Sequence, residues 1–259
     1  MKFKQYLTEG RSRSIRFDEA INILKTKCSK AIKSHKHSPI FRGVRDRFSD
    51  DVISLIKPKD HTRVSANTSN IYTLLIDDMK SWKQYPNRGQ SIICTTDREY
   101  SRVYGETYVI FPYDGAKIGV TSSIDFWGGF RYGLGTGAWG DMDAFNSQLN
   151  YMISEQMNIR FDKNSAKSMK KSFQMFDKVS GERNDITSII DSIYWMKDYY
   201  KHGSLLKTIE NALDPKKNGF KLAKIGDKLI RGVEVWTDSP SIMVKYADTG
   251  YDRVMEAIG

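Results

Sequence analysis

Two short motifs offer side chains that suit a polar or anionic ligand. Arg42 follows an apolar run and precedes Gly43, whose missing side chain allows close approach of another backbone segment. A guanidinium donates to two oxygens at once, so Arg42 suits a phosphate or pyrophosphate group. Cys94, Thr95 and Thr96 end a second apolar run and bring a thiol and two hydroxyls to one strand end. The structural alternatives are an ion pair for Arg42 and strand packing for the threonines.

Two carboxylates are further candidates for chemistry. Glu234 alternates with Val233 and Val235, so its side chain points to the strand face opposite these apolar neighbours. A single glutamate on an otherwise apolar strand can bond a ligand; the alternative is an ordinary charge on a solvent face. Asp125 follows the polar segment 121–123, where it is either a second acid near the site or a turn residue.

Arg63 and Asn67 form a third candidate motif. They lie in a polar stretch that leads into a predicted helix over 71–82. The free amides at a helix N-terminus attract anions, so this stretch predicts a second anion-binding position. Asparagine and threonine also cap helices and form turns, and this alternative applies to at least one residue of the stretch.

The stretch 90–120 predicts the elements that position these motifs. β-branched residues favour a strand that ends at Thr96, and Asp97 or Thr96 suits the N-cap of the short helix that follows. Two further strands are joined at Asp114-Gly115. Asp-Gly between apolar runs indicates a hairpin, because glycine accepts the positive φ of such a turn. We therefore expect the hydroxyl-bearing strand end to lie close to a hairpin.

The rest of the chain predicts helices first and strands last. A helix with Asp18 as its N-cap is expected over 17–35, and apolar residues at helical spacing follow over 143–214. The glycine-rich stretch 127–141 contains a G-x-G-x-x-G pattern but lacks the preceding strand and βαβ repeat of a dinucleotide-binding turn. It is better interpreted as a mobile lid or insertion, or as aromatic packing on the core. The C-terminal part predicts strands and a final helix, at 220–225, 228–230, 233–237, 242–246 and 248–259.

The order of these motifs resembles that of the ADP-ribosyltransferase fold. Such enzymes carry an arginine on an early strand, a Ser-Thr-Ser-like strand end and a glutamate on a late strand, which match Arg42, Cys94-Thr95-Thr96 and Glu234. The chain also resembles a group of uncharacterised proteins of T4-like phages. The matching pieces are Arg42-Gly43, Arg63 with Asn67-Thr68, Arg88 through Thr96, Tyr104-Gly105 with Phe111-Pro112, and Glu234-Val235.

This resemblance implies an α+β fold, an ADP-ribosyltransferase-like split β-sheet core with a helical insertion. It implies NAD as substrate without a metal, Glu234 as the catalytic residue, and an NAD site at Arg42, Gly43, Arg63, Asn67, Cys94, Thr95 and Thr96. Asp125 matches an aspartate of the phage group and is a possible second acid. The implied function is mono-ADP-ribosylation of a host protein or nucleic acid.

Two positions depart from the pattern of the resembled enzymes. Cys94 replaces the first serine, and a thiol is a weak hydrogen-bond donor. Gly232 stands where many arginine-directed enzymes place Glu or Gln, which disfavours arginine as the acceptor. Two alternatives therefore stay open. One is a catalytically degenerate virion structural or DNA-contacting protein on the same fold, and the other is an NAD glycohydrolase or RNA phosphotransferase.

Composition limits the class of protein and its partners. The formal net charge of +10 over 259 residues favours an anionic partner, possible DNA or capsid contact included, or serves solubility alone. Cys28 and Cys94 suit free thiols in a reducing compartment. The four histidines show no paired spacing with cysteine, which disfavours a structural zinc site. No apolar run approaches the roughly 20 residues of a membrane-spanning helix, so we expect no membrane partner.

The N-terminal residues resemble the capsid-targeting peptides of T4-like internal head proteins. Those peptides begin with a similar Met-Lys and aromatic pattern and are cut after Leu-x-Glu, which Leu7-Thr8-Glu9 matches. The alternative is an ordinary amphipathic turn. The resemblance implies location in the virion or the host cytoplasm. The expected organisation is a targeting-like segment over 1–16, core over 17–130, a glycine-rich loop and helical insertion over 131–215, and core strands over 216–259.

Overall fold

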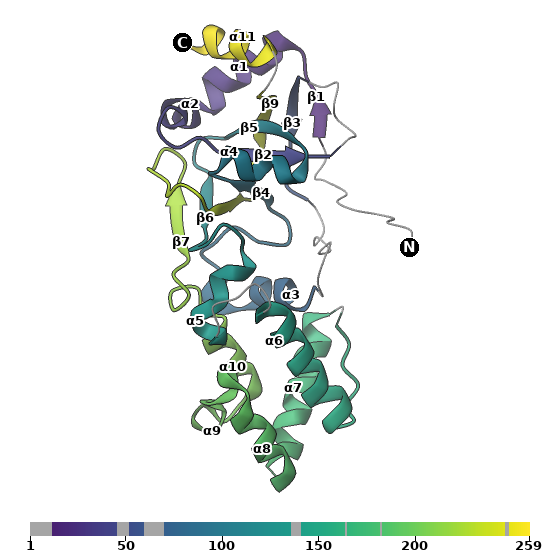
Figure 1. The fold of residues 1–259 in the computed structure, drawn as a ribbon. Coiled ribbons are helices and arrows are strands. Elements are labelled where there is room, and N and C mark those ends of the chain that lie inside the picture. The colour runs from purple at the N-terminus through teal and green to yellow at the C-terminus, as the bar shows by residue number, and fades with distance from the viewer. Residues whose placement is uncertain are drawn as a thin grey trace. The chain divides into compact units, whose positions relative to one another are not determined.

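A computed structural model describes residues 12–45, 52–59, 70–135, 141–163, 165–181, 183–246 and 249–259. These residues form two compact units, one within 1–63, 84–125 and 221–259 and the other within 64–83 and 126–220. The helical insertion was expected over 131–215. The second unit begins earlier, at residue 126, and also includes residues 64–83. Figure 1 shows the sheet in the first unit and helices in the second.

The first unit is built on a nine-stranded antiparallel sheet, so the mixed α and β class is confirmed. Its strand order is β1-β3-β9-β5-β2-β4-β8-β6-β7. The strands are β1 (Ser12–Ser14), β2 (Phe41–Val44), β3 (Ile53–Ile56), β4 (Ile92–Thr95), β5 (Glu106–Pro112), β6 (Lys117–Val120), β7 (Lys221–Lys224), β8 (Glu234–Thr237) and β9 (Ser241–Lys245).

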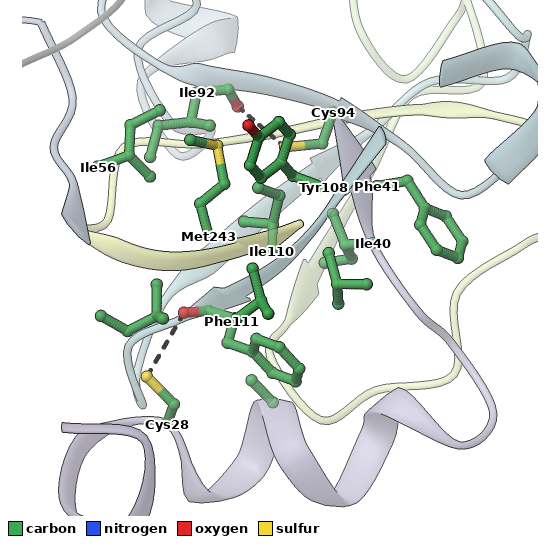
Figure 2. Packing of buried hydrophobic residues seen from close by; sticks show 14 of the residues in the cluster. Cys28, Ile40, Phe41, Ile56, Ile92, Cys94, Tyr108, Ile110, Phe111 and Met243 are labelled. Carbon is green, nitrogen blue, oxygen red and sulfur yellow. Dashed lines mark hydrogen bonds between the residues drawn. The ribbon is translucent and has the colours of Figure 1, made fainter. Parts of the chain in front are cut away.

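A weak junction divides this sheet between β2 and β4. A single residue pair, Phe41 with Thr95, joins these two strands, whereas β2 and β5 share four pairs and β4 and β8 share four. The division separates β1-β3-β9-β5-β2 from β4-β8-β6-β7. Buried residues of both parts pack together, and Figure 2 shows Ile92 and Cys94 of β4 beside Tyr108 of β5 and Met243 of β9.

Helices cover one face of the larger part of the sheet. α1 (Phe17–Lys27), α2 (Ser29–His35) and α11 (Thr249–Ile258) contact β3, β5 and β9, while α4 (Arg98–Ser101) and the following 3₁₀ turn η2 (Arg102–Tyr104) contact β2. On this face Phe111 lies towards α2 and Cys28, the residue between α1 and α2 (Figure 2). The Cys28 thiol donates to the Phe111 carbonyl oxygen at 3.4 Å.

The second unit consists of helices and helical turns. They are α3 (Ile71–Asp78), η1 (Lys80–Trp82), η3 (Trp127–Phe130), α5 (Arg131–Leu134), α6 (Asp141–Asn150), η4 (Tyr151–Gln156), α7 (Ala166–Ser180), α8 (Asn184–Ser192), η5 (Tyr194–Met196), α9 (Tyr199–His202) and α10 (Leu205–Ala212). Phe126, Phe130 and Phe220 pack around Trp82, with ring centroids 5.0 to 6.0 Å from the indole. Within the glycine-rich stretch, Phe130 therefore packs in a core, as the second interpretation expects, whereas Tyr132 is exposed.

The Asp114-Gly115 turn forms, but the predicted hairpin is wrong. β5 pairs with β2 and β9, and β6 pairs with β7 and β8, so the two strands flanking the turn are not neighbours. The Asp114 carboxylate accepts hydrogen bonds from the amide and hydroxyl of Ser29 and from the amide of Lys30. This attachment to the start of α2 turns the chain from one part of the sheet to the other.

Other elements differ from expectation in detail. The helix expected over 17–35 is interrupted at Cys28, and it begins at Phe17 with Arg16, not Asp18, as its N-cap. The strand expected over 228–230 is absent; this segment has no regular secondary structure, and its Ile230 carbonyl accepts a hydrogen bond from the Thr96 hydroxyl at 2.8 Å. β1 and β3 were not predicted. Among the described residues, no helix is both long enough and apolar enough to cross a membrane.

Candidate active site

The three motifs lie on three consecutive strands, β2, β4 and β8. Thr95 of β4 is paired with Phe41 of β2 on one side and with Glu234 of β8 on the other. Residues directly opposite each other on antiparallel strands share a face of the sheet. The Thr95 and Glu234 side chains therefore emerge side by side, at the place where the sheet divides.

The backbone of Glu234 is held by the loop that follows β6. Its amide donates to the Ser123 carbonyl and its carbonyl accepts the Thr121 amide, both at 3.0 Å. The Thr121 hydroxyl also donates to the Glu234 carbonyl at 3.1 Å and bonds the Ser123 carbonyl. These bonds fix the position of Glu234 and bring the segment that contains Asp125 back to β8.

The Glu234 carboxylate forms a buried ion pair with Arg88. Nη2 of Arg88 lies 2.6 Å from Oε1 of Glu234, and the side chains are only 10% and 11% exposed. The Arg88 guanidinium also lies over the Trp236 ring, 5.8 Å from its centroid. An adjacent cation favours the charged form of a carboxylate, so the pairing offsets part of the cost of burying both charges.

Trp236 holds the segment that carries Arg88. The indole lies on the same strand face as Glu234, and it occupies the space above Gly119, where a side chain would clash with the ring. Its Nε1 donates to the Pro86 carbonyl at 2.9 Å, and Tyr85 stacks on the ring at 6.3 Å with an interplanar angle of 19°. Arg88 is therefore placed by packing and directed bonding.

Two tyrosines lie near both acids. The hydroxyls of Tyr100 and Tyr104 are 3.0 Å apart, and their rings meet edge to face. Burial is the main cause that raises the pKa of each phenol, and the charges of Asp125 and Glu234 raise both further. The two carboxylates thus act on one pair of protonated phenols, of which Tyr104 is exposed.

The two threonine hydroxyls bond to the backbone. The Thr95 hydroxyl donates to the Val233 carbonyl at 3.2 Å and accepts the Asp97 amide at 3.0 Å. The Thr96 hydroxyl donates to the Ile230 carbonyl at 2.8 Å and accepts the Val233 amide at 3.1 Å. These bonds hold the turn before β8 against the end of β4, so the threonines position Glu234 through the backbone.

Arg42 lies on the other side of the sheet from Glu234. Its neighbour Phe41 shares the face of Thr95 and Glu234 through the strand pairing, so Arg42 starts from the opposite face, where it is paired with the buried Tyr108. Nη1 of Arg42 donates to the Ile93 carbonyl of β4. Arg42 therefore bridges β2 and β4 where their pairing ends, and the sheet does not bring its guanidinium to Glu234.

Gly43 and Cys94 also have structural surroundings. A side chain at Gly43 would clash with the Ser101 carbonyl and would lie 2.7 Å from the Tyr104 Cβ, so glycine allows α4 and η2 to lie on β2. Cys94 is paired with Val235 on the face opposite Thr95, and both are buried in the apolar core. The thiol therefore points away from Glu234. Arg63 and Asn67 lie outside the described residues.

Three residues of the site were missed as functional candidates by the sequence reasoning. Arg88 and Tyr104 entered only as parts of the match to the phage group, and Tyr100 lies in the short helix expected after Thr96. A buried glutamate requires a cationic partner, so such a partner could be expected from the sequence. The spacing of residues along the chain does not show which arginine or lysine it is. The four-residue spacing of Tyr100 and Tyr104 in a helical segment is a local signal that their side chains are in contact.

Searches of known protein families, curated proteins and solved structures found no match to this chain. The site must therefore be interpreted from its own geometry. Within the described part of the chain, no three His, Cys, Asp or Glu residues gather in a way that could hold a metal ion.

Proposed function

We propose that this protein is an NAD-dependent mono-ADP-ribosyltransferase of phage origin that modifies a host macromolecule. The observation that carries the proposal is the position of Glu234. This carboxylate stands directly opposite Thr95 where an antiparallel sheet divides, and Arg88 is paired with it at 2.6 Å. Asp125, Tyr100 and Tyr104 lie within electrostatic reach of the same place. The ADP-ribosyltransferase-like split core is part of this proposal.

The reaction breaks the bond between the nicotinamide nitrogen and C1 of the ribose. The bonding electrons leave with nicotinamide, and positive charge develops on the sugar, as in glycoside cleavage. A carboxylate that is already ionised and fixed in a site of low exposure stabilises this charge without reorganising. Glu234 takes this role, and its carboxylate bonds the ribose hydroxyl.

The acceptor nucleophile then bonds to C1 and releases its proton. Asp125 is the second acid and takes this proton as a general base, a role that requires it to reach the acceptor directly or through one water. The Tyr100 and Tyr104 phenols stay protonated, and their mutual bond leaves one O–H as a donor to the ligand. Thr95 and Thr96 act as positioning residues, because they bond the turn before Glu234.

This assignment changes the roles of the arginines. Arg88 takes over the place beside the catalytic glutamate, while Arg42 positions β4 through its bond to the Ile93 carbonyl. Gly232 has φ +78°, a conformation that L side chains rarely adopt. A Glu or Gln there is disfavoured by the backbone, which supports an acceptor other than arginine.

The test uses NAD that carries a label on its adenylate part. The protein is incubated with labelled NAD and host extract, and the macromolecular adduct is measured after separation from free ADP-ribose. We expect labelling by the wild-type chain and a loss of at least about a hundredfold in Glu234→Gln. Glu256→Gln, an exposed position on α11, is the matched control and should label as the wild type does. Full labelling by Glu234→Gln removes the proposal.

A second candidate is a scaffold of the same fold that does not turn over NAD, acting as a virion structural or DNA-contacting protein. The observations that favour it are the bonds that the threonine hydroxyls make to the backbone and the bond of Arg42 to Ile93 on the other face. It predicts no heat of NAD binding in calorimetry. The enzyme predicts binding, and nicotinamide release on prolonged incubation.

A further inference from the structure

A group of lysines gathers on the first unit. Lys30 and Lys33 of α2 and Lys228, which follows the turn after β7, line a hollow of about 440 Å³. Lys117 on β6 and Lys224 on β7 share one strand face and continue the positive charge along the adjoining strands. We call these five residues the α2–β7 basic surface. All five side chains are exposed.

The turn after β7 is fixed against α2. Gly226 has φ +104°, and the nearest atom to the space beside its Cα is the Lys30 Cβ at 3.6 Å. The Leu229 amide donates to the buried Ser38 hydroxyl at 3.0 Å, which holds the chain after the turn to the end of the α2 segment. Figure 1 shows the upper end of β7 next to α2. Lys30 and Lys33 therefore face Lys228 across the hollow.

The carboxylates that border this surface are bonded by backbone amides. Asp227 Oδ2 accepts the Lys224 amide at 2.7 Å, and the Asp114 oxygens accept the amides of Ser29 and Lys30. In the described ranges 12–45, 84–125 and 221–246, no ion pair joins any of the five ammonium groups to an acid. The five lysines carry more positive charge than Asp227 and Asp114 balance, which favours an external anion.

The pairing of β6 with β7 places two positive charges opposite each other, which does not favour folding. Lys117 and Lys224 are directly opposite each other on β6 and β7. Like charges at such positions repel, so this pair lowers the stability of the sheet. Lysines on an edge strand do discourage association between sheets. Lysines on the edge strand β7 alone would meet this need, however. Protection of the sheet edge therefore explains neither Lys117 on β6 nor the lysines of α2.

We propose that the α2–β7 basic surface binds the phosphate backbone of nucleic acid. Lysine ammonium groups act as point charges for phosphates and carry no base recognition, so the binding is independent of sequence. Lys30 and Lys33, one helical turn apart, and Lys228 across the hollow contact phosphates from two sides. The proposal uses none of the residues of the candidate active site and stands whether or not the protein turns over NAD.

The experiment measures the fluorescence anisotropy of a labelled DNA duplex of about 20 base pairs between about 50 and 200 mM NaCl. The test variant is Lys30→Gln/Lys33→Gln/Lys228→Gln. The matched control, Lys171→Gln/Lys201→Gln/Lys207→Gln, removes the same charge from exposed positions of the second unit. Unchanged circular dichroism of both variants ensures that folded proteins are compared.

We expect the wild type to bind the duplex with an affinity that falls steeply with salt. The test variant should bind about tenfold more weakly or worse at the middle of the salt range, with a salt slope reduced by about 2 to 3, because each lost phosphate contact removes about 0.9. The control should keep both values. Absence of wild-type binding at the lowest salt, equal losses in both variants, or binding only to phosphatidylserine vesicles overturns the proposal.

Discussion

Oε1 of Glu234 and Nη2 of Arg88 are 2.6 Å apart in a place where both side chains are nearly withdrawn from solvent. Burying a charge without a partner costs free energy, so each of the two residues compensates the charge of the other. The two residues are far apart in the sequence, and Trp236 helps to place Arg88, because its indole bonds the Pro86 carbonyl and stacks with Tyr85. The stability of this pair and the activity of the site should therefore be coupled.

Replacing Arg88 with Met should destabilise the protein by about 3–5 kcal/mol, because it leaves the Glu234 carboxylate buried without its cation. Urea unfolding followed by tryptophan fluorescence measures the change in the free energy of unfolding. The double variant Arg88→Met/Glu234→Gln should recover part of the loss, since neither charge then remains. A loss below about 1 kcal/mol in Arg88→Met, the range of an exposed pair, contradicts a buried ion pair.

Gly43→Ala should destabilise the protein by about 1–3 kcal/mol through overpacking, since the new methyl group meets the Ser101 carbonyl and the Tyr104 Cβ. Relief requires α4 and η2 to shift, so the proposed activity should fall as well. Gly181→Ala is the matched control, because nothing lies within 4 Å of the added methyl and the backbone φ is −66°. If thermal unfolding shows equal effects at both positions, the close contact of β2 with α4 is wrong.

The sequence predicted local elements well where one signal decides them. Asp97 is the N-cap of α4 and accepts the Tyr100 amide at 3.1 Å, as its position before the helix indicated. The late strands β8 and β9 occupy the apolar runs expected of them. The site motifs on β2, β4 and β8 were also found in the sequence, because their residue types stand out from the apolar residues around them.

Pairing between distant segments could not be predicted in the same way. Asp114-Gly115 has the composition of a hairpin turn, yet the Asp114 carboxylate bonds the start of α2 and sends β5 and β6 to separate parts of the sheet. The face on which Arg42 starts follows from one pair, Phe41 with Thr95, whose register no local pattern fixes. Tertiary contacts decided both outcomes.

Asp114→Ala should destabilise the protein by about 0.5–2 kcal/mol, the usual range for the loss of a carboxylate that caps the first amides of a helix. The bonds at stake are those to the Ser29 hydroxyl at 2.7 Å and the Lys30 amide at 2.8 Å. Both carboxylate oxygens accept hydrogen bonds, so Asp114→Asn, which keeps one acceptor oxygen, should lose less stability than Asp114→Ala. Equal losses in the two variants in chemical unfolding contradict a capping role.

His35 should make the stability of the protein depend on pH below about 6.5. Burial lowers the pKa of its imidazole from 6.5, and the ring bonds the Tyr251 hydroxyl through Nε2 at 2.8 Å. Because the folded state binds this proton less readily than the unfolded state, the stabilisation is present above the unfolded pKa and is lost as the pH falls below it. Thermal unfolding between about pH 5 and pH 8 should show a slope that His35→Gln reduces. His37→Gln, on the exposed residue two positions along, should leave the slope unchanged. A slope that persists in His35→Gln would assign the effect to another group.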